Sequence, residues 1–196
     1  MLMRMRLLTT LILSICITSA YADTTPSNTG VIHFTGEIIN PSCTIDTSDG
    51  EDKVPLGSYP TSDFTAANVG HETTAMPFTV TLNDCPPSTT GLENIHLELS
   101  GTEVSGHDDL LAVSQITTSG DSVVVPATNI GIAVSIDDGH ETPLKFGDSG
   151  DLIQIPLAAT AGTPITQDFI ARYKSYSSPV AAGPADADMT ITILYR

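Results

Sequence analysis

Hydrophobic and polar residues alternate along several separate stretches of this 196-residue chain. Successive side chains of a strand point to opposite faces, so alternation sends one set into a core and the other towards solvent. The stretches are residues 78–82, 95–99, 130–136, 169–173 and 189–195. β-branched residues dominate them, and Gly, Pro, Asp and Ser cluster between them. The pattern predicts an all-β protein, with one short helix at residues 62–69.

Many short strands separated by turn signals indicate a β-sandwich of immunoglobulin type. The chain contains no tryptophan, whereas a true antibody-type domain places one beside its disulfide. No internal repeat or long linker divides the sequence, and its length suits a single domain.

The first 22 residues have the features of a signal peptide. Arg4 and Arg6 form a positive start, residues 7–17 are mostly apolar, and Ala20 and Ala22 flank Tyr21 in a small-x-small pattern. We therefore expect cleavage after Ala22.

Two alternatives concern this segment. A retained membrane anchor needs about 20 apolar residues, and this run has only 11. Lipid attachment at Cys16 is the second, but Ile15 is bulky where lipoprotein signals usually carry a small residue.

Cleavage removes Cys16 and leaves Cys43 and Cys85. An even pair in an exported chain predicts a disulfide, and no Cys-x-x-Cys or Cys/His cluster favours a metal. Closing a loop of about 40 residues stabilises a fold by roughly 4 kcal/mol in the chain-entropy model.

The formal charge is −16, and all 23 acidic residues follow Ala22 together with only five of the seven basic ones. The mature chain is therefore near −18, which disfavours nucleic acid and anionic membranes as partners. Solubility outside the cytoplasm is the simpler explanation of this charge.

The sequence shows no arrangement typical of an enzyme, a metal site or a cofactor site. The histidines are scattered, without H-x-H or H-x-x-x-H spacing: His33, His71, His96, His107 and His140. The acidic stretches at residues 137–139 and 148–151 lack the pattern of an EF-hand and fit turns better. We expect no catalytic, metal-binding or cofactor-binding residues.

Both ends of the mature chain carry strand patterns. Residues 30–36 alternate, with Gly30, Ile32, Phe34 and Gly36 on one face, and lead directly into a second strand-like run at 37–45. The last strand runs to the chain end. Residues 30–36 can therefore be the first strand of the same sandwich, or can pair elsewhere; the alternation alone leaves both open.

Specific motifs extend over nearly the whole mature chain. They are VIHFTGEIIN before Cys43, VPLG at 54–57, FTVTLNDC at 78–85, ATNIGI at 127–132, FIARY at 169–173, AGPADAD at 182–188 and ILYR at 193–196. In order and spacing the chain resembles the major pilins of chaperone–usher fimbriae, particularly type 1 pilins.

The resemblance implies an incomplete immunoglobulin-like β-sandwich, the pilin fold, completed by a donated strand. A periplasmic chaperone fills the gap first, and an outer-membrane usher exchanges it for the next subunit's N-terminal extension. The implied division is a signal peptide at 1–22, a donor extension at 23–36 and a pilin domain at 37–196.

The resemblance also assigns residues to these roles. The donor face is Asn28, Gly30, Ile32, Phe34 and Gly36, with Gly30 meeting a pocket too shallow for a side chain. The groove and chaperone contacts are Met189, Ile191, Ile193, Tyr195 and the terminal carboxylate of Arg196.

The implied function is a structural subunit of a pilus shaft, exported through the periplasm to the cell surface, where it supports adhesion and biofilm formation. Its partners are copies of itself, other pilus subunits, the chaperone and the usher. The alternative is a minor, adaptor or tip-associated subunit; tip adhesins carry an additional lectin domain, for which this chain has no room. A secreted sandwich enzyme or inhibitor is disfavoured by the missing site chemistry.

Overall fold

The computed structural model describes residues 32–34, 38, 40, 43–47, 53–114, 125–147 and 150–195. Its contacts divide the chain into a unit of residues 1–35 and a unit of residues 36–196. The described strands, all in the second unit, are β1 Thr44–Thr47, β2 Met76–Asn83, β3 Asn94–Gly101, β4 Glu103–Val104, β5 His107–Ala112, β6 Ile130–Ile136, β7 Leu152–Pro156, β8 Ile165–Ser175 and β9 Met189–Tyr195.

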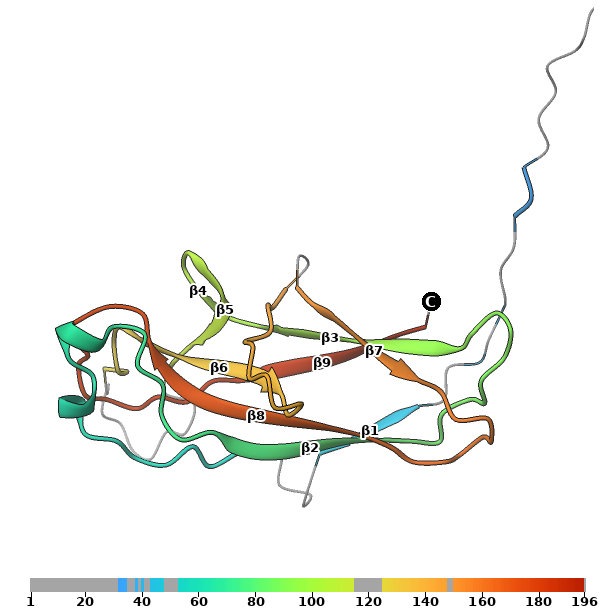
Figure 1. Cartoon of the computed structure of the whole chain (residues 1–196), viewed down its shortest axis with the longest axis horizontal. Coiled ribbons are helices and arrows are strands. Elements are labelled where there is room, and N and C mark those ends of the chain that lie inside the picture. Colours follow the sequence, from blue (N-terminus) through green and yellow to red (C-terminus); the bar gives the residue numbers. More distant parts are fainter. Residues whose placement is uncertain are drawn as a thin grey trace, which may run out of the picture. The chain divides into compact units, whose positions relative to one another are not determined.

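The strands form two antiparallel sheets (Figure 1). One has six strands in the order β1-β2-β8-β6-β5-β4, and the other has three in the order β7-β3-β9. Side chains from both sheets meet in one hydrophobic core. The prediction of an all-β sandwich is confirmed.

The alternating residues of the predicted strands supply that core. Val80 and Leu82 of β2 and Ile95 and Leu97 of β3 are fully buried. Because a strand presents every second side chain to the same face, the period of two identified these inward positions correctly. β6 is an exception, because alternation predicted that one of its faces is exposed to solvent.

β6 is buried on both faces, including Gly131, Ala133 and Ser135. A second cluster of Val104, Leu110 and Ala133 covers part of its outer face. A Cβ on Gly131 would lie 3.0 Å from the carbonyl oxygen of Leu111, so the neighbouring β5 packs very close there. Small residues on the outer face of this central strand are therefore buried by closely packed neighbours. The alternation pattern alone cannot distinguish such a buried face from a solvent-exposed one.

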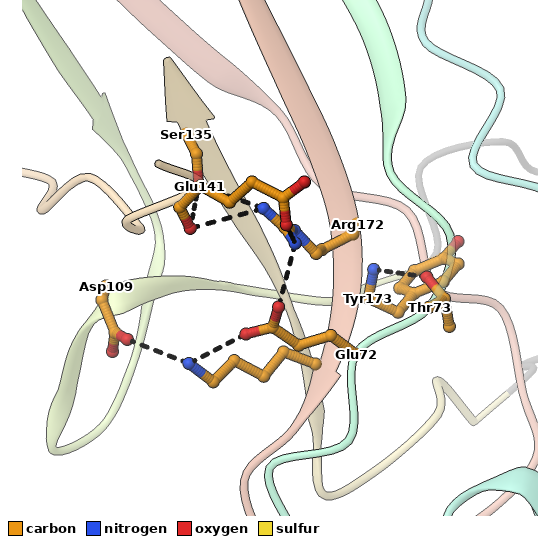
Figure 2. Close-up of polar contacts among 8 residues, drawn as sticks. Glu72, Thr73, Asp109, Ser135, Glu141, Arg172 and Tyr173 are labelled. Atoms are coloured by element: carbon orange, nitrogen blue, oxygen red, sulfur yellow. Dashed lines mark hydrogen bonds and ion pairs between the residues drawn. The ribbon is translucent and has the colours of Figure 1, made fainter. Parts of the chain in front are cut away.

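A buried arginine organises another part of this outer face (Figure 2). Arg172 of β8 is 4% exposed and donates hydrogen bonds of 3.0 Å to Glu72 and 2.7 Å to Glu141. Lys174, two residues further along, lies 3.2 Å from Glu72 and 3.8 Å from Asp109. These ion pairs connect β8 to β5 and to the segments around Glu72 and Glu141.

Two sequence expectations need correction. The helix expected at 62–69 consists of two 3-10 turns, η2 Thr61–Asp63 and η3 Ala66–Asn68, each too short for an α-helical segment. In the second strand-like run, expected at 37–45, Ile38 and Asn40 lie outside any strand, and the described strand begins at Thr44. Residues 32–34 form no strand within this chain, and their pairing with a neighbouring copy stays a prediction. A strand needs a hydrogen-bonded neighbour, and β1 acquires one only where it pairs with β2.

Candidate functional site

The C-terminal strand has a hydrogen-bonded neighbour on one side only. β9 pairs with β3, from Ile95 opposite Tyr195 to Gly101 opposite Met189. β1 likewise pairs with β2 alone, so each is the edge of its sheet within the described residues. An unpaired edge presents backbone N–H and C=O groups to an incoming strand.

Burial differs sharply between the two strands of this pair. Ile95, Leu97 and Leu99 of β3 are at most 1% exposed, whereas the β9 residues opposite them are only partly buried. Directly opposed residues share one face of a sheet and therefore face the same core. Since β3 is covered and β9 is not, the core lacks a covering element beside β9.

That opening is an apolar groove of about 540 Å³. Its floor comes from β2, β5, β6 and β8, and its two rims come from the β1 side and from the start of β9. The lining residues are Ile45, Lys53, Val54, Leu56, Phe78, Leu111, Ile132, Val134, Ala171, Ala187, Asp188, Met189 and Ile191.

The groove leaves core side chains incompletely covered. Phe78 stacks on Phe169 with ring centroids 5.3 Å apart; Phe169 is fully buried, while Phe78 is only partly so. Ile45 is 38% exposed although its cross-strand partner Leu82 is fully buried. Covering apolar surface releases about 25 cal/mol per Å², so the groove favours an apolar segment.

The two edges approach each other beside Tyr195. Its phenolic oxygen accepts a 3.1 Å hydrogen bond from the backbone N–H of Cys43, just before β1. The predicted disulfide between Cys43 and Cys85 is present and ties this point to the end of β2. The groove is lined instead by the earlier β9 residues Met189 and Ile191.

Only part of the sequence-predicted site can be placed. Met189 and Ile191 line the groove, whereas Ile193 and Tyr195 pack against the core further along β9. Ile32 and Phe34 are 76% and 92% exposed. The remaining predicted residues lie outside those described: Ala20, Ala22, Asn28, Gly30, Gly36 and Arg196.

Sequence reasoning missed the floor and one rim of the groove. Leu111, Ile132, Val134 and Ala171 carry the signal of ordinary core residues, because alternation identifies a face and not whether that face is covered. The rim at Val54 and Leu56 belongs to one of the quoted motifs, but nothing in the motif indicated its place.

The described residues show no competing chemical site. They contain no group of three or more His, Cys, Asp or Glu side chains able to hold a metal ion. Within that same part of the chain, no helix has the length and apolar character to cross a membrane. Of the histidines, His71 packs against Phe64 with ring centroids 5.5 Å apart.

Sequence comparison identifies relatives over almost the whole length. A family model described as "Fimbrial protein" matches residues 32–196. The "Fimbrial subunit type 1" of Salmonella typhimurium is 33% identical, covering 99% of this chain and 100% of the relative. The "Type-1 fimbrial protein subunit" of Serratia marcescens is also 33% identical, covering 94% of this chain and 96% of the relative.

Solved structures give the same fold. The crystal structure of the P pilus rod subunit PapA has a TM-score of 0.58 at 20% identity, covering 79% of this chain and 99% of that one. A structure of a chaperone–usher pilus has a TM-score of 0.51 at 21% identity, covering 89% of this chain and 100% of that one. The predicted pilin fold is therefore confirmed.

Proposed function

The chain belongs to the fimbrial protein family, and from that premise we propose that it is a shaft subunit which polymerises by donating its N-terminal segment to the groove of the next copy. The family consists of fimbrial subunits, so the protein is structural and not an enzyme.

The observation that carries the proposal is the apolar groove flanked by two sheet edges. Within the described residues, β9 and β1 each have an unpaired edge on either side of the groove, and the partly covered core residue Phe78 lies between them. Strand addition uses both features, since main-chain hydrogen bonds give affinity and alternate side chains give register. No small-molecule site would need an open backbone edge.

The occupant we propose is the segment around residues 32–38 of a second copy. Ile32, Phe34 and Ile38 are 76%, 92% and 100% exposed, and their even spacing places them on one face of an extended strand. Burying such a side chain fully contributes about 1.5–3 kcal/mol. Each net backbone hydrogen bond adds roughly 0.5–1.5 kcal/mol.

Ile38 extends the apolar face beyond the donor residues expected from the resemblance. Gly36 then lies inside this face, between Phe34 and Ile38, whereas Gly30 lies at its start. Either glycine can lie over a shallow point of the groove, and the donor strand would be shifted along the groove between these two alignments. We propose a donor strand that includes Ile38.

The positions of the donor segment and the groove determine how the copies assemble. The donor segment precedes the β-sandwich and the groove lies within it, so each copy accepts one neighbour and donates to another. Such a head-to-tail contact does not close on itself and generates a filament. A chaperone covers the groove before assembly, the usher exchanges it at the outer membrane, and the surface fibre supports adhesion and biofilm formation.

Deletion of residues 23–35 tests the proposal. Every residue that lines the groove lies beyond Thr35, so the truncated subunit should still bind the chaperone and accept a donor. It should not add onto the groove of another subunit, and laddering of polymers on cold SDS gels should stop. Deletion of residues 23–27 alone is the matched control, because it keeps the apolar face. Normal polymers from the longer deletion would overturn strand donation.

A further inference from the structure

Among the described residues, a cavity of about 330 Å³ lies apart from the apolar groove and shares none of its lining residues. It is found near the C-terminal end of β8, where Tyr173 meets the segment at 57–64 and the loop at 180–186. We call it the tyrosine cavity. Its volume is suited to a small ligand, and strand donation to the groove leaves it without a role.

Two tyrosine rings form a corner of the tyrosine cavity. The ring centroids of Tyr59 and Tyr173 are 6.1 Å apart, and the ring planes meet at 80°. Both side chains are only partly buried, whereas Phe64, which also lines the cavity, is buried. The face of an aromatic ring carries negative charge density and attracts a cation within about 6 Å of its centroid. Two nearly perpendicular rings on one cavity therefore favour a positively charged group.

Another wall of the tyrosine cavity consists of small residues that hydrogen bonds hold in place. Ala181 and Ala185 line the cavity, and their short side chains leave its interior open. The backbone N–H of Ala127 donates a 2.8 Å hydrogen bond to the carbonyl oxygen of Pro184. The phenol of Tyr173 donates one of 3.1 Å to the carbonyl oxygen of Ala185. Because this wall is fixed before a ligand arrives, binding costs little conformational entropy.

Asp186 adds a carboxylate to the same cavity. Burial raises the pKa of the Tyr173 phenol, and the charge of Asp186 raises that pKa further, so the carboxylate lies near the ring. The backbone of Asp186 is fixed by hydrogen bonds of 2.7 Å and 3.0 Å with the backbone of Ser114. None of the described lining residues is a lysine or an arginine. The strongly acidic mature chain also attracts cations over a longer range.

We propose that the tyrosine cavity binds the quaternary ammonium group of a small organic cation such as choline. The rings of Tyr59 and Tyr173 contact the methyl groups on the nitrogen, and the carboxylate of Asp186 balances the charge. A quaternary ammonium is more weakly hydrated than a primary amine, so it loses less on leaving water. The inference is independent of strand donation, because the cavity and the groove have no lining residue in common.

Titration of the isotope-labelled mature chain with choline, followed by NMR, tests the proposal. Amide resonances of the lining segments at 57–64 and 180–186 should shift, with a dissociation constant in the millimolar range. Dimethylbutanol, the uncharged carbon isostere of choline, should bind at least about tenfold more weakly, because only the cation is attracted by the rings and the carboxylate. Equal affinities for the two probes, or no shifts at the cavity, would overturn the proposal.

Variants assign the binding to individual side chains. Tyr59→Leu should weaken choline binding about three- to tenfold, whereas Tyr59→Phe keeps the aromatic face and should bind nearly as the native chain does. Asp186→Asn should weaken binding by a similar factor, and that difference should shrink at high salt. Glu93→Gln is the matched control, because it removes an equal charge from an exposed residue outside the cavity lining.

The same spectra report whether each variant keeps its fold, since resonances away from the cavity should not move. If Tyr59→Leu binds choline like Tyr59→Phe, or Asp186→Asn like Glu93→Gln, the cation site is overturned. The comparison of choline with its isostere uses the native chain alone and decides the question even where a variant does not fold.

Discussion

The backbone N–H of Cys43 donates a 3.1 Å hydrogen bond to the phenolic oxygen of Tyr195. These residues are 152 positions apart in sequence and belong to opposite sheet edges: Cys43 precedes β1, and Tyr195 ends β9. The contact joins the two edges that flank the groove. The β9 residues that line the groove are its first ones, Met189 and Ile191, so the contact lies further along β9 than the lined part of the groove.

Tyr195→Phe should weaken the contact between the two sheet edges. The substitution keeps the ring but removes the acceptor of a partly buried N–H, which typically costs about 0.5–1.5 kcal/mol. Urea unfolding of the purified mature chain measures the change. An unaltered midpoint would show that water replaces the phenolic oxygen without loss.

Removal of the disulfide should have a larger effect. The bond between Cys43 and Cys85 spans 42 positions and holds β1 against β2, where only four residues pair. The double variant Cys43→Ser, Cys85→Ser should lose roughly 4 kcal/mol of unfolding free energy in the chain-entropy model. The native chain in reductant is the control and should match the variant; equal stability with and without the bond would contradict the prediction.

Arg172 should contribute more to stability than an exposed ion pair. Its side chain is 5% exposed, while Glu72 and Glu141 remain 30% and 57% exposed. Arg172→Met keeps the aliphatic part of the side chain, and both glutamates remain partly in contact with solvent. We therefore expect the free energy of unfolding to fall by about 1–3 kcal/mol, less than for a fully buried ion pair. Lys145→Met, which removes an exposed pair with Asp108, is the control and should change the urea midpoint little.

Because of Tyr173, we expect the native chain to lose stability at alkaline pH. Burial raises the pKa of its phenol, and the nearby Asp186 carboxylate and Tyr59 raise that pKa further. The phenol also donates a 3.1 Å hydrogen bond to the carbonyl oxygen of Ala185. Because the pKa of Tyr173 is higher in the folded state, its phenol contributes to the free energy of unfolding in full below the unfolded-state pKa near 10. That contribution is lost as the pH rises through the folded-state pKa.

Tyr173→Phe checks this assignment. The variant should be less stable near neutral pH, because the hydrogen bond is absent, and should lose less stability than the native chain above pH ~10. Thermal unfolding at a series of pH values measures both effects. Parallel pH profiles for the two proteins would assign the alkaline loss to other groups.

Two glycine variants should distinguish the donor registers. If the donor strand includes Ile38, Gly36 faces the groove between two apolar anchors, and Gly36→Leu should block subunit exchange. Gly30→Leu should then slow it less, because Gly30 lies at the start of the apolar face. The opposite ranking in a chaperone-displacement assay would assign the shallow point of the groove to Gly30.

The sequence was sufficient to predict the strands β2, β3, β6, β8 and β9 and many of the residues that face the core, whereas β4, β5 and β7 were not among the predicted stretches. Val80, Leu82, Ile95 and Leu97 were identified by alternation, since a strand repeats every two residues whatever its neighbours are. The pairing of Cys43 with Cys85 followed from their even number in an exported chain. Alternation failed at β6, where Ala133 and Ser135 looked outward-facing but are buried by other segments.

The sequence by itself therefore determined most of the β strands, many of the inward positions and the alternating apolar pattern of the N-terminal segment. Within the described part of the chain, tertiary structure decided that β9 and β1 are edges and that Phe78 and Ile132 form the floor of a groove between them. The physical reason is that alternation is local, whereas coverage depends on which strands become neighbours. A face can be apolar in sequence and still lack the strand that covers it, and here that strand is the one we propose a second copy supplies.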